Sequence, residues 1–106
     1  MAKIANQELG RLSVEEFKNT KKNPFVVVMD NVRSLHNVGS VFRTCDAFLA
    51  EKLYLCGITG TPPNREINKT ALGATDSVSW EHHPDVLALI GQLQHENYVV
   101  VAVEQA

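Results

Sequence analysis

The sequence predicts an α/β fold in which a parallel sheet carries helices on both faces. Strand-like and helix-like segments alternate along most of the chain. The run Phe25–Met29 is apolar at every position, as expected for a central parallel strand with both faces buried. Residues 86–93 instead repeat apolar side chains at helical spacing, which indicates a helix that packs on such a sheet.

The chain divides into two parts at Pro24. Residues 1–23 are polar and helix-prone, and we expect an N-terminal helical extension there, followed by a sheet domain of residues 24–106. Ser13 and Glu16 stand at the spacing of a capping box, which predicts a short helix that begins after Ser13. Because a proline disfavours helical geometry in the residue before it, this helix should end ahead of Pro24.

Within the sheet domain, the expected elements form a Rossmann-like series with short connections. The expected strands are 25–29, 52–56, 77–82 and 98–103, and the expected helices are 38–49, 65–72 and 84–95. Gly73 suits the end of the second of these helices, and Pro84 suits the first turn of the third. Since the segment 98–103 is as apolar as the first strand, we expect the two to be adjacent or nearly adjacent central strands.

Composition bounds the class of protein. A chain of 106 residues is one small domain, and its ten basic against twelve acidic residues give a formal net charge of -2. This balance does not indicate a nucleic-acid binder, so RNA contact would have to rest on a local patch. The basic run Lys18, Lys21 and Lys22 fits either a solvated helix end or such a patch. We expect a soluble, cytoplasmic protein, because no secretory segment opens the chain and no apolar run is long enough to cross a membrane.

The cysteines and the histidine pair favour structural interpretations. Cys45 and Cys56 fall on the apolar sides of an expected helix and an expected strand, as small buried hydrophobic residues do. His82 and His83 are adjacent, so their side chains point apart, and no cysteine or carboxylate stands at ligand spacing. We therefore expect no bound metal.

The most informative segment is the polar loop and helix after the first strand. Open α/β sheets bind ligands outside the carboxyl ends of their strands, where a loop leads into a helix. Asn37 and Gly39 stand at the expected helix start, and Arg43 follows about one turn later, where its side chain can reach back. Asn37 is also a good helix N-cap by itself, and Gly39 can simply ease packing. Arg43 can instead form a structural salt bridge with Asp30 or Asp46.

These residues resemble the first motif of the SpoU/TrmH family of RNA 2'-O-methyltransferases, in the SPOUT superfamily. The matching positions are Asn37, Gly39, Val41, Phe42, Arg43, Thr44, Asp46, Ala47 and Phe48. The segments 30–32 and 69–74 also look like the family, and the resemblance runs from about Phe25 to Ala106. The family's second motif, Gly-x-Glu-x-x-Gly, and its third, an apolar-Pro segment followed by Ser-Leu-Asn, do not occur in this sequence. The resemblance thus implies an incomplete SPOUT domain, the N-terminal two-thirds of such a protein.

The resemblance implies that the intact enzyme is a homodimer that transfers a methyl group from S-adenosylmethionine to a ribose 2'-hydroxyl of tRNA or rRNA. It places Arg43 beside that hydroxyl as a catalytic residue. Because arginine is normally protonated, its physically safer role is a forked donor to the RNA phosphate that also orients the hydroxyl. Asn37 would hydrogen-bond Arg43 or the nucleotide, and Gly39 would let the RNA backbone approach closely.

Five further residues complete the expected site. His36, Lys69 and Thr70 are candidates for RNA contact. Glu104 and Gln105 follow the last expected strand, at a position that lines the adenosine side of the cofactor site in the family. Because the segment that completes this pocket is missing, we expect the 106-residue chain to bind the cofactor poorly and to be inactive alone.

Two other interpretations remain open. The chain fits a noncatalytic RNA-binding module that retained the motif. It fits less well an unrelated flavodoxin-like nucleotide binder, because it has no phosphate-cradling Gly-x-Gly-x-x-Gly segment. Codons for the two missing motifs downstream of Ala106 would favour the enzyme.

Overall fold

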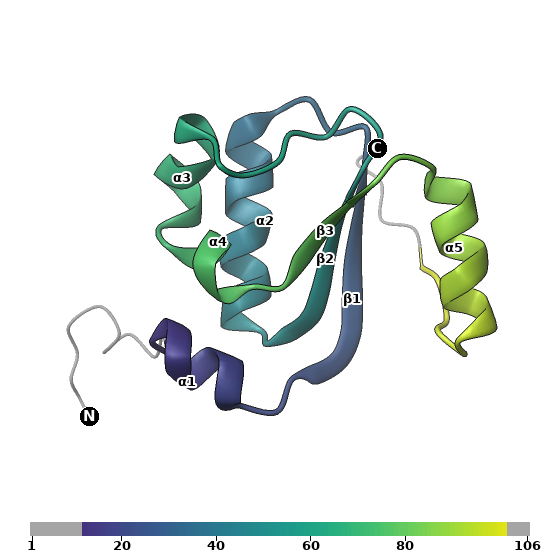
Figure 1. Ribbon diagram of the computed structural model, residues 1–106, viewed down its shortest axis with the longest axis horizontal. Helices are drawn as coiled ribbons and strands as arrows, with labels where there is room; N and C mark the ends of the chain where they lie inside the picture. The colour runs from purple at the N-terminus through teal and green to yellow at the C-terminus, as the bar shows by residue number, and fades with distance from the viewer. Residues whose placement is uncertain (1–11, 102–106) are drawn as a thin grey trace.

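A computed structural model describes residues 12–101 and shows three layers (Figure 1). Among these residues, the strands β1 (Asn23–Asp30), β2 (Ala50–Cys56) and β3 (Trp80–His83) form one sheet in the order β1-β2-β3. Both strand pairs are parallel, which confirms the expected sheet. The helices are α1 (Val14–Asn19), α2 (Leu35–Ala47), α3 (Arg65–Ala71), α4 (Ala74–Ser77) and α5 (Val86–His95).

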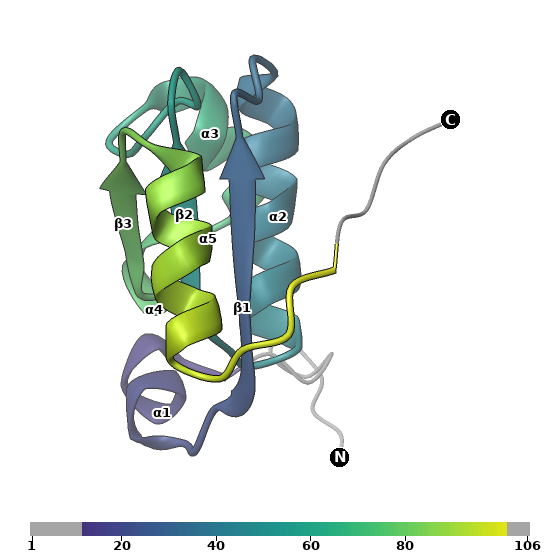
Figure 2. The ribbon, with the colours of Figure 1, turned by 90° about the vertical axis from the view of Figure 1, so that its right-hand side faces the viewer.

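The helices divide between the two faces and one end of the sheet. Helices α2, α3 and α4 cover one face, α5 covers the other, and α1 lies where β1 begins (Figures 1 and 2). Successive strand residues point to opposite faces, so each strand contributes side chains to the cores on both faces of the sheet. The larger core, on the α2 side, contains Phe17, Met29, Val38, Phe42, Cys45, Ala50, Leu53, Leu55, Ile67, Ala71, Ala74 and Val78. On the α5 side, Leu89 and Leu93 pack with Cys56.

Local signals placed the first helix well and the second less well. The Ser13 hydroxyl accepts from the Glu16 amide at 3.1 Å, and the Glu16 carboxylate accepts from the Ser13 amide at 3.0 Å, which confirms the capping box. Helix α2, however, begins at Leu35 because the Ser34 side chain caps it by accepting from the Asn37 amide at 3.1 Å. The expectation that Asn37 marks the helix start is therefore wrong.

The region between α3 and α5 also differs from the expected pattern. Leu72 and Gly73 both adopt left-handed geometry, with φ values of 50° and 91°, and this turn leads into α4. The strand expected from residue 77 consequently begins only at Trp80. The Asp85 carboxylate caps α5 by accepting from two backbone amides at 3.0 and 3.2 Å, so Pro84 precedes the helix rather than opening it.

The last expected strand does not form within the described residues. Val99 is 88% exposed and Val101 is 76% exposed, and neither belongs to a strand. Tyr98 instead holds this segment, because its hydroxyl donates to the Glu51 carboxylate at 2.6 Å and its ring packs on the α5 side. Since β1 pairs only with β2 here, the expectation of two neighbouring central strands is wrong.

Two simple expectations concern the cysteines and membrane spans. Cys45 and Cys56 are buried free thiols, as expected. Burial raises the pKa of the Cys45 thiol to about 11 and also raises the pKa of Cys56, so neither is poised as a thiolate nucleophile. Among residues 12–101, no helix is long and apolar enough to cross a membrane.

Gly39 lies where α2 and α3 cross in close contact. A Cβ atom at this position would stand 1.9 Å from the Thr70 hydroxyl oxygen and 2.4 Å from the Ile67 carbonyl oxygen. The Thr70 hydroxyl also donates to the His36 carbonyl at 2.9 Å, which ties the two helices together. A side chain at residue 39 would therefore force the helices apart.

We predict that Gly39→Ala lowers the free energy of unfolding by about 1–3 kcal/mol, because the new methyl group overpacks the crossing. Gly91→Ala is the matched control: Gly91 lies in α5, and a Cβ there would meet nothing within 4 Å. That substitution should stabilise the protein by about 0.5–1 kcal/mol through helix propensity. Urea unfolding of both variants measures the difference, and equal effects would contradict the crossing argument.

Candidate active site

The carboxyl ends of β1 and β2 are joined by a side-chain amide. Asn31, directly after β1, adopts left-handed geometry with a φ of 53°, and its Oδ1 accepts from the Ile58 amide at 2.9 Å. Gly57 lies against this amide, and a Cβ there would stand 2.0 Å from Asn31 Oδ1. The loop that leads into α2 is thereby fixed against the loop that leaves β2.

Thr59 makes a second connection at the same edge. This residue is 4% exposed, and its hydroxyl accepts from the Val32 amide at 3.0 Å while it donates to the Cys56 carbonyl at 2.7 Å. His82 Nε2 lies 2.9 Å from the Gly57 carbonyl oxygen, which extends the connection to β3. We use the term edge lock for Asn31, Gly57, Thr59 and His82. No local pattern identified Thr59 and His82 as partners, since they meet residues from other loops.

Arg43 and Asn37 both lie on α2 with exposed side chains. Their separation of six residues directs the side chains about 120° apart around the helix axis. Helix α2 alone therefore does not bring the two side chains together, although one of the expected roles of Asn37 was a hydrogen bond to Arg43. The ion pairs within residues 12–101 join Lys52 to Glu81 and Lys69 to Glu66.

The salt bridges considered for Arg43 do not form. Asp46 is 5% exposed and buried in the core, whereas Arg43 is exposed, and no ion pair joins Arg43 to Asp30 or Asp46. Within the part of the chain that the structure describes, the guanidinium has no hydrogen-bond acceptor. It is therefore available to an anion from outside the chain.

The residues expected to contact RNA separate into two groups. Gly39 is buried against α3, so it admits a helix rather than an RNA backbone, and the Thr70 hydroxyl is used between the helices. His36 is exposed in the first turn of α2. The Lys69 ammonium pairs with Glu66 at 3.2 Å, but both side chains are more than half exposed, and such pairs contribute little. His36 and Lys69 thus remain accessible, whereas Gly39 and Thr70 have internal roles.

Two other sets of candidates have simple outcomes. Glu104 and Gln105 lie outside the described residues. In the basic run, the Lys22 ammonium donates to the carbonyls of Phe17 and Thr20 and lies 4.5 Å from the centre of the Phe17 ring. Lys22 therefore binds carbonyls at the end of α1, while Lys18 and Lys21 remain exposed. Residues 12–101 contain no group of three or more side chains arranged to hold a metal.

The fold is a parallel α/β sheet with flanking helices, a class of protein that binds its ligands at the carboxyl edge of the sheet. The motif carried by α2, after this edge, points to a particular family within this class. The chain belongs to the SpoU rRNA methylase family, whose model matches residues 24–106. That match includes the edge lock and all of α2 through α5.

Curated relatives agree with this family. The chain is 28% identical over 95 residues to a tRNA (guanosine(18)-2'-O)-methyltransferase of Thermus thermophilus, a match that covers 90% of this chain and 48% of the relative. It is 33% identical over 82 residues to an uncharacterized tRNA/rRNA methyltransferase of Synechocystis, covering 73% of this chain and 18% of that protein. The chain thus spans about half the length of the Thermus relative.

Solved structures share the fold. An RNA 2'-O ribose methyltransferase superposes with a TM-score of 0.58 at 21% identity, covering 74% of this chain and 31% of that one. The SpoU methyltransferase AviRb of Streptomyces viridochromogenes, in complex with AdoMet, superposes with a TM-score of 0.62 at 18% identity. That match covers 77% of this chain and 31% of AviRb. The described sheet therefore corresponds to part of a larger methyltransferase fold.

We predict that Thr59→Val destabilises the protein by about 1–3 kcal/mol, because it leaves the Val32 amide without its partner at the sheet edge. Thr44→Val is the control, since the Thr44 hydroxyl is exposed and donates to the Ser40 carbonyl within α2. Its effect should stay within about 0.5 kcal/mol. Thermal unfolding followed by circular dichroism compares the two, and an equally small loss for Thr59→Val would mean that the edge lock contributes little.

Proposed function

We propose that this chain is part of an RNA ribose 2'-O-methyltransferase that uses S-adenosylmethionine and acts on tRNA or rRNA. Membership of the SpoU family supports the reaction, and the names of the relatives support the RNA substrate. The AdoMet complex of AviRb supports the cofactor. The observation that carries the proposal within this chain is Arg43, an exposed arginine of the matched motif without an acceptor among residues 12–101.

The chemistry assigns Arg43 a positioning role toward the RNA. When bound, S-adenosylmethionine supplies an electrophilic methyl group for an oxygen nucleophile. The 2'-hydroxyl must lose its proton to another group, since a guanidinium is normally protonated and is a poor base. Two parallel N–H groups of Arg43 match the geometry of a phosphate and would hold the ribose beside it in one orientation. Asn37, on another side of α2, would hydrogen-bond the nucleotide rather than Arg43.

Two polar side chains at the sheet edge are already engaged within the described residues. Asn31 Oδ1 and the Thr59 hydroxyl point into this edge, but both already serve backbone partners. A cofactor there would need other groups, and we propose Glu104 and Gln105 among them. We further propose that the active protein is a cytoplasmic homodimer, on the basis of the family resemblance.

We predict that Arg43→Ala weakens binding of the chain to tRNA transcripts and reduces the slope of log K against log salt concentration by about 0.7–0.9, the loss of one phosphate contact. Arg43→Lys should retain the slope, since it keeps the charge, but should not restore methyl transfer in the natural protein that contains these residues. Lys52→Gln, in which a cation already paired with Glu81 is removed, serves as the control and should leave the slope unchanged.

Filter binding across a salt series measures these slopes, and melting curves report folding. An unchanged slope together with a large fall in melting temperature would favour a structural role for Arg43. If Arg43→Ala loses RNA binding while the unsubstituted natural protein transfers no methyl group to any tested RNA, the results would favour the noncatalytic RNA-binding module.

A separate prediction concerns the cofactor. The 106-residue chain alone should bind S-adenosylmethionine with a Kd weaker than about 1 mM and should transfer no methyl group, because the matched structures and relatives extend well beyond the part it covers. Isothermal titration calorimetry with the cofactor tests this. Saturable binding in the micromolar range would show that residues 1–106 form a complete cofactor pocket.

A further inference from the structure

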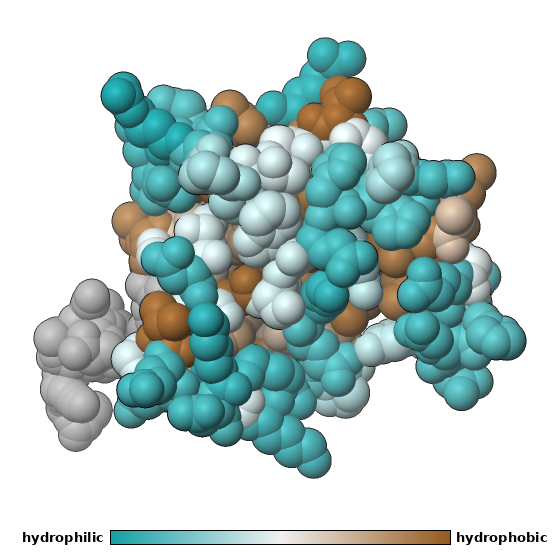
Figure 3. Space-filling view, in the orientation of Figure 1, coloured by the Kyte–Doolittle hydropathy of each residue, from teal (hydrophilic) through white to brown (hydrophobic). Residues whose placement is uncertain are grey.

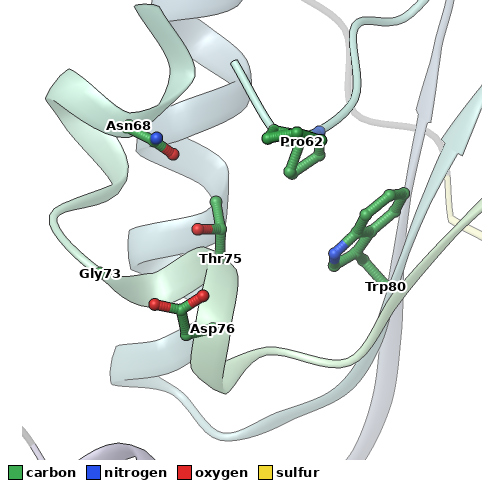
Figure 4. A pocket seen from close by; sticks show the side chains of 7 residues that line it. Pro62, Asn68, Gly73, Thr75, Asp76 and Trp80 are labelled. Carbon is green, nitrogen blue, oxygen red and sulfur yellow. The ribbon is translucent and has the colours of Figure 1, made fainter. Parts of the chain in front are cut away.

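An open pocket of about 530 Å³ lies on the α3–α4 side of the sheet (Figure 4). It is lined by Pro62, Pro63, Asn68, Gly73, Thr75, Asp76 and Trp80. Three separate segments supply these residues: the loop after β2, the helices α3 and α4 with their connection, and the start of β3. The volume is within the range of small-molecule sites.

The walls of the pocket differ in chemistry. Pro62 and Trp80 line one side, while Asn68 and Thr75 line the other and Asp76 lies beside Thr75 on α4 (Figure 4). In the space-filling view, near-neutral surface occupies the middle of this face, with both hydrophilic and hydrophobic side chains around it (Figure 3). A flat molecule with an apolar face and a polar edge fits such walls.

Trp80 is held in a fixed orientation. Its ring meets the ring of the fully buried Phe42 edge-to-face, with centroids 6.4 Å apart and an interplanar angle of 80°. The indole remains partly exposed, and its nitrogen is directed toward α4 (Figure 4). An aromatic surface preorganised in this way is a stacking platform, of the kind on which proteins place unpaired bases.

Two polar side chains of the pocket, Asn68 and Asp76, have no partner within the part of the chain that the structure describes. Among residues 12–101, neither the Asn68 amide nor the Asp76 carboxylate has a side-chain hydrogen bond or an ion pair. A carboxylate only accepts hydrogen bonds, and it has two oxygens to offer. It therefore selects an edge with two adjacent donors, while the Asn68 amide supplies a donor nearby.

We propose that this pocket binds an unpaired guanine base of the RNA substrate. Guanine is the RNA base that presents two adjacent donors, N1–H and the exocyclic amino group, beside an acceptor, O6. Asp76 accepts from the two donors, Asn68 donates to O6, and the base lies against Trp80 and Pro62. The inference rests on the proposed function, because it takes RNA as the partner.

Two cationic side chains near the pocket suit the phosphate groups of a nucleotide. Arg65 and Lys69 are four residues apart on α3, so they share the side of the helix next to Asn68, and both are exposed. Their cations are placed to meet the phosphates that flank a bound base. Glu66 on the same helix pairs with Lys69, so Arg65 is the cation of α3 that has no ion pair among residues 12–101, and Asp76 is left to accept from the base edge.

The experiment uses Trp80 as its own probe, since it is the only tryptophan in the chain. Guanosine 5'-monophosphate should quench its fluorescence saturably, and adenosine 5'-monophosphate should bind about tenfold more weakly because it lacks the paired donors. Asp76→Asn should weaken guanosine monophosphate binding by about tenfold and remove most of the preference. Asn68→Ala should weaken it less, and Glu96→Gln, an exposed carboxylate at the end of α5, should change nothing.

Each outcome decides one point. Equal binding of the two nucleotides, or an unaltered preference in Asp76→Asn with a native circular dichroism spectrum, overturns the guanine site. The absence of saturable quenching overturns any base site at this pocket. Methyl transfer, assayed separately in the natural protein, tests the proposed function. Methyl transfer without a preference for guanosine monophosphate would contradict only the guanine site. A preference for guanosine monophosphate without methyl transfer would contradict only the proposed enzymatic activity.

Discussion

The close crossing of α2 and α3 at Gly39 determines where the exposed functional groups lie. A glycine at this position lets the Thr70 hydroxyl reach the His36 carbonyl at 2.9 Å, so two helices from different parts of the chain share one surface. Arg43 of α2 and Lys69 of α3 are then fixed relative to each other by backbone packing rather than by their own flexible side chains. Any residue with a Cβ at position 39 would push the two helices apart and so change the position of one cation relative to the other.

The edge lock complements this crossing. Asn31 and Thr59 bond to backbone groups across the ends of β1 and β2, so the loop that opens α2 cannot move independently of the sheet. The crossing fixes α2 on its α3 side, and the edge lock fixes its start. A site built on such supports can hold a ribose and its phosphate in one orientation, which is what transfer to a single hydroxyl requires.

A formal net charge of -2 is compatible with RNA binding because the cations differ in use. Lys22 donates to carbonyls at the end of α1, and Lys52 pairs with Glu81 at 2.8 Å, a contact that raises the pKa of Lys52 and lowers that of Glu81. Arg43 and Arg65 are exposed, and neither joins an ion pair among residues 12–101. A few cations free of internal partners on one side of the sheet can give a local positive potential in an acidic protein.

The sequence by itself determined the features that depend on neighbours along the chain. The capping box of Ser13 and Glu16 was predictable because it is set by contacts within a few residues, and β1 and α5 were predictable from the apolar pattern of their own residues. The motif also pointed to α2 and Arg43. Only the tertiary structure decided the internal use of Gly39 and Thr70, the partners of Thr59, the pocket around Trp80, and the exposed course of Val99–Val101. Each of these depends on residues brought together from distant parts of the chain, and apolar character alone does not say whether a segment finds a strand to pair with.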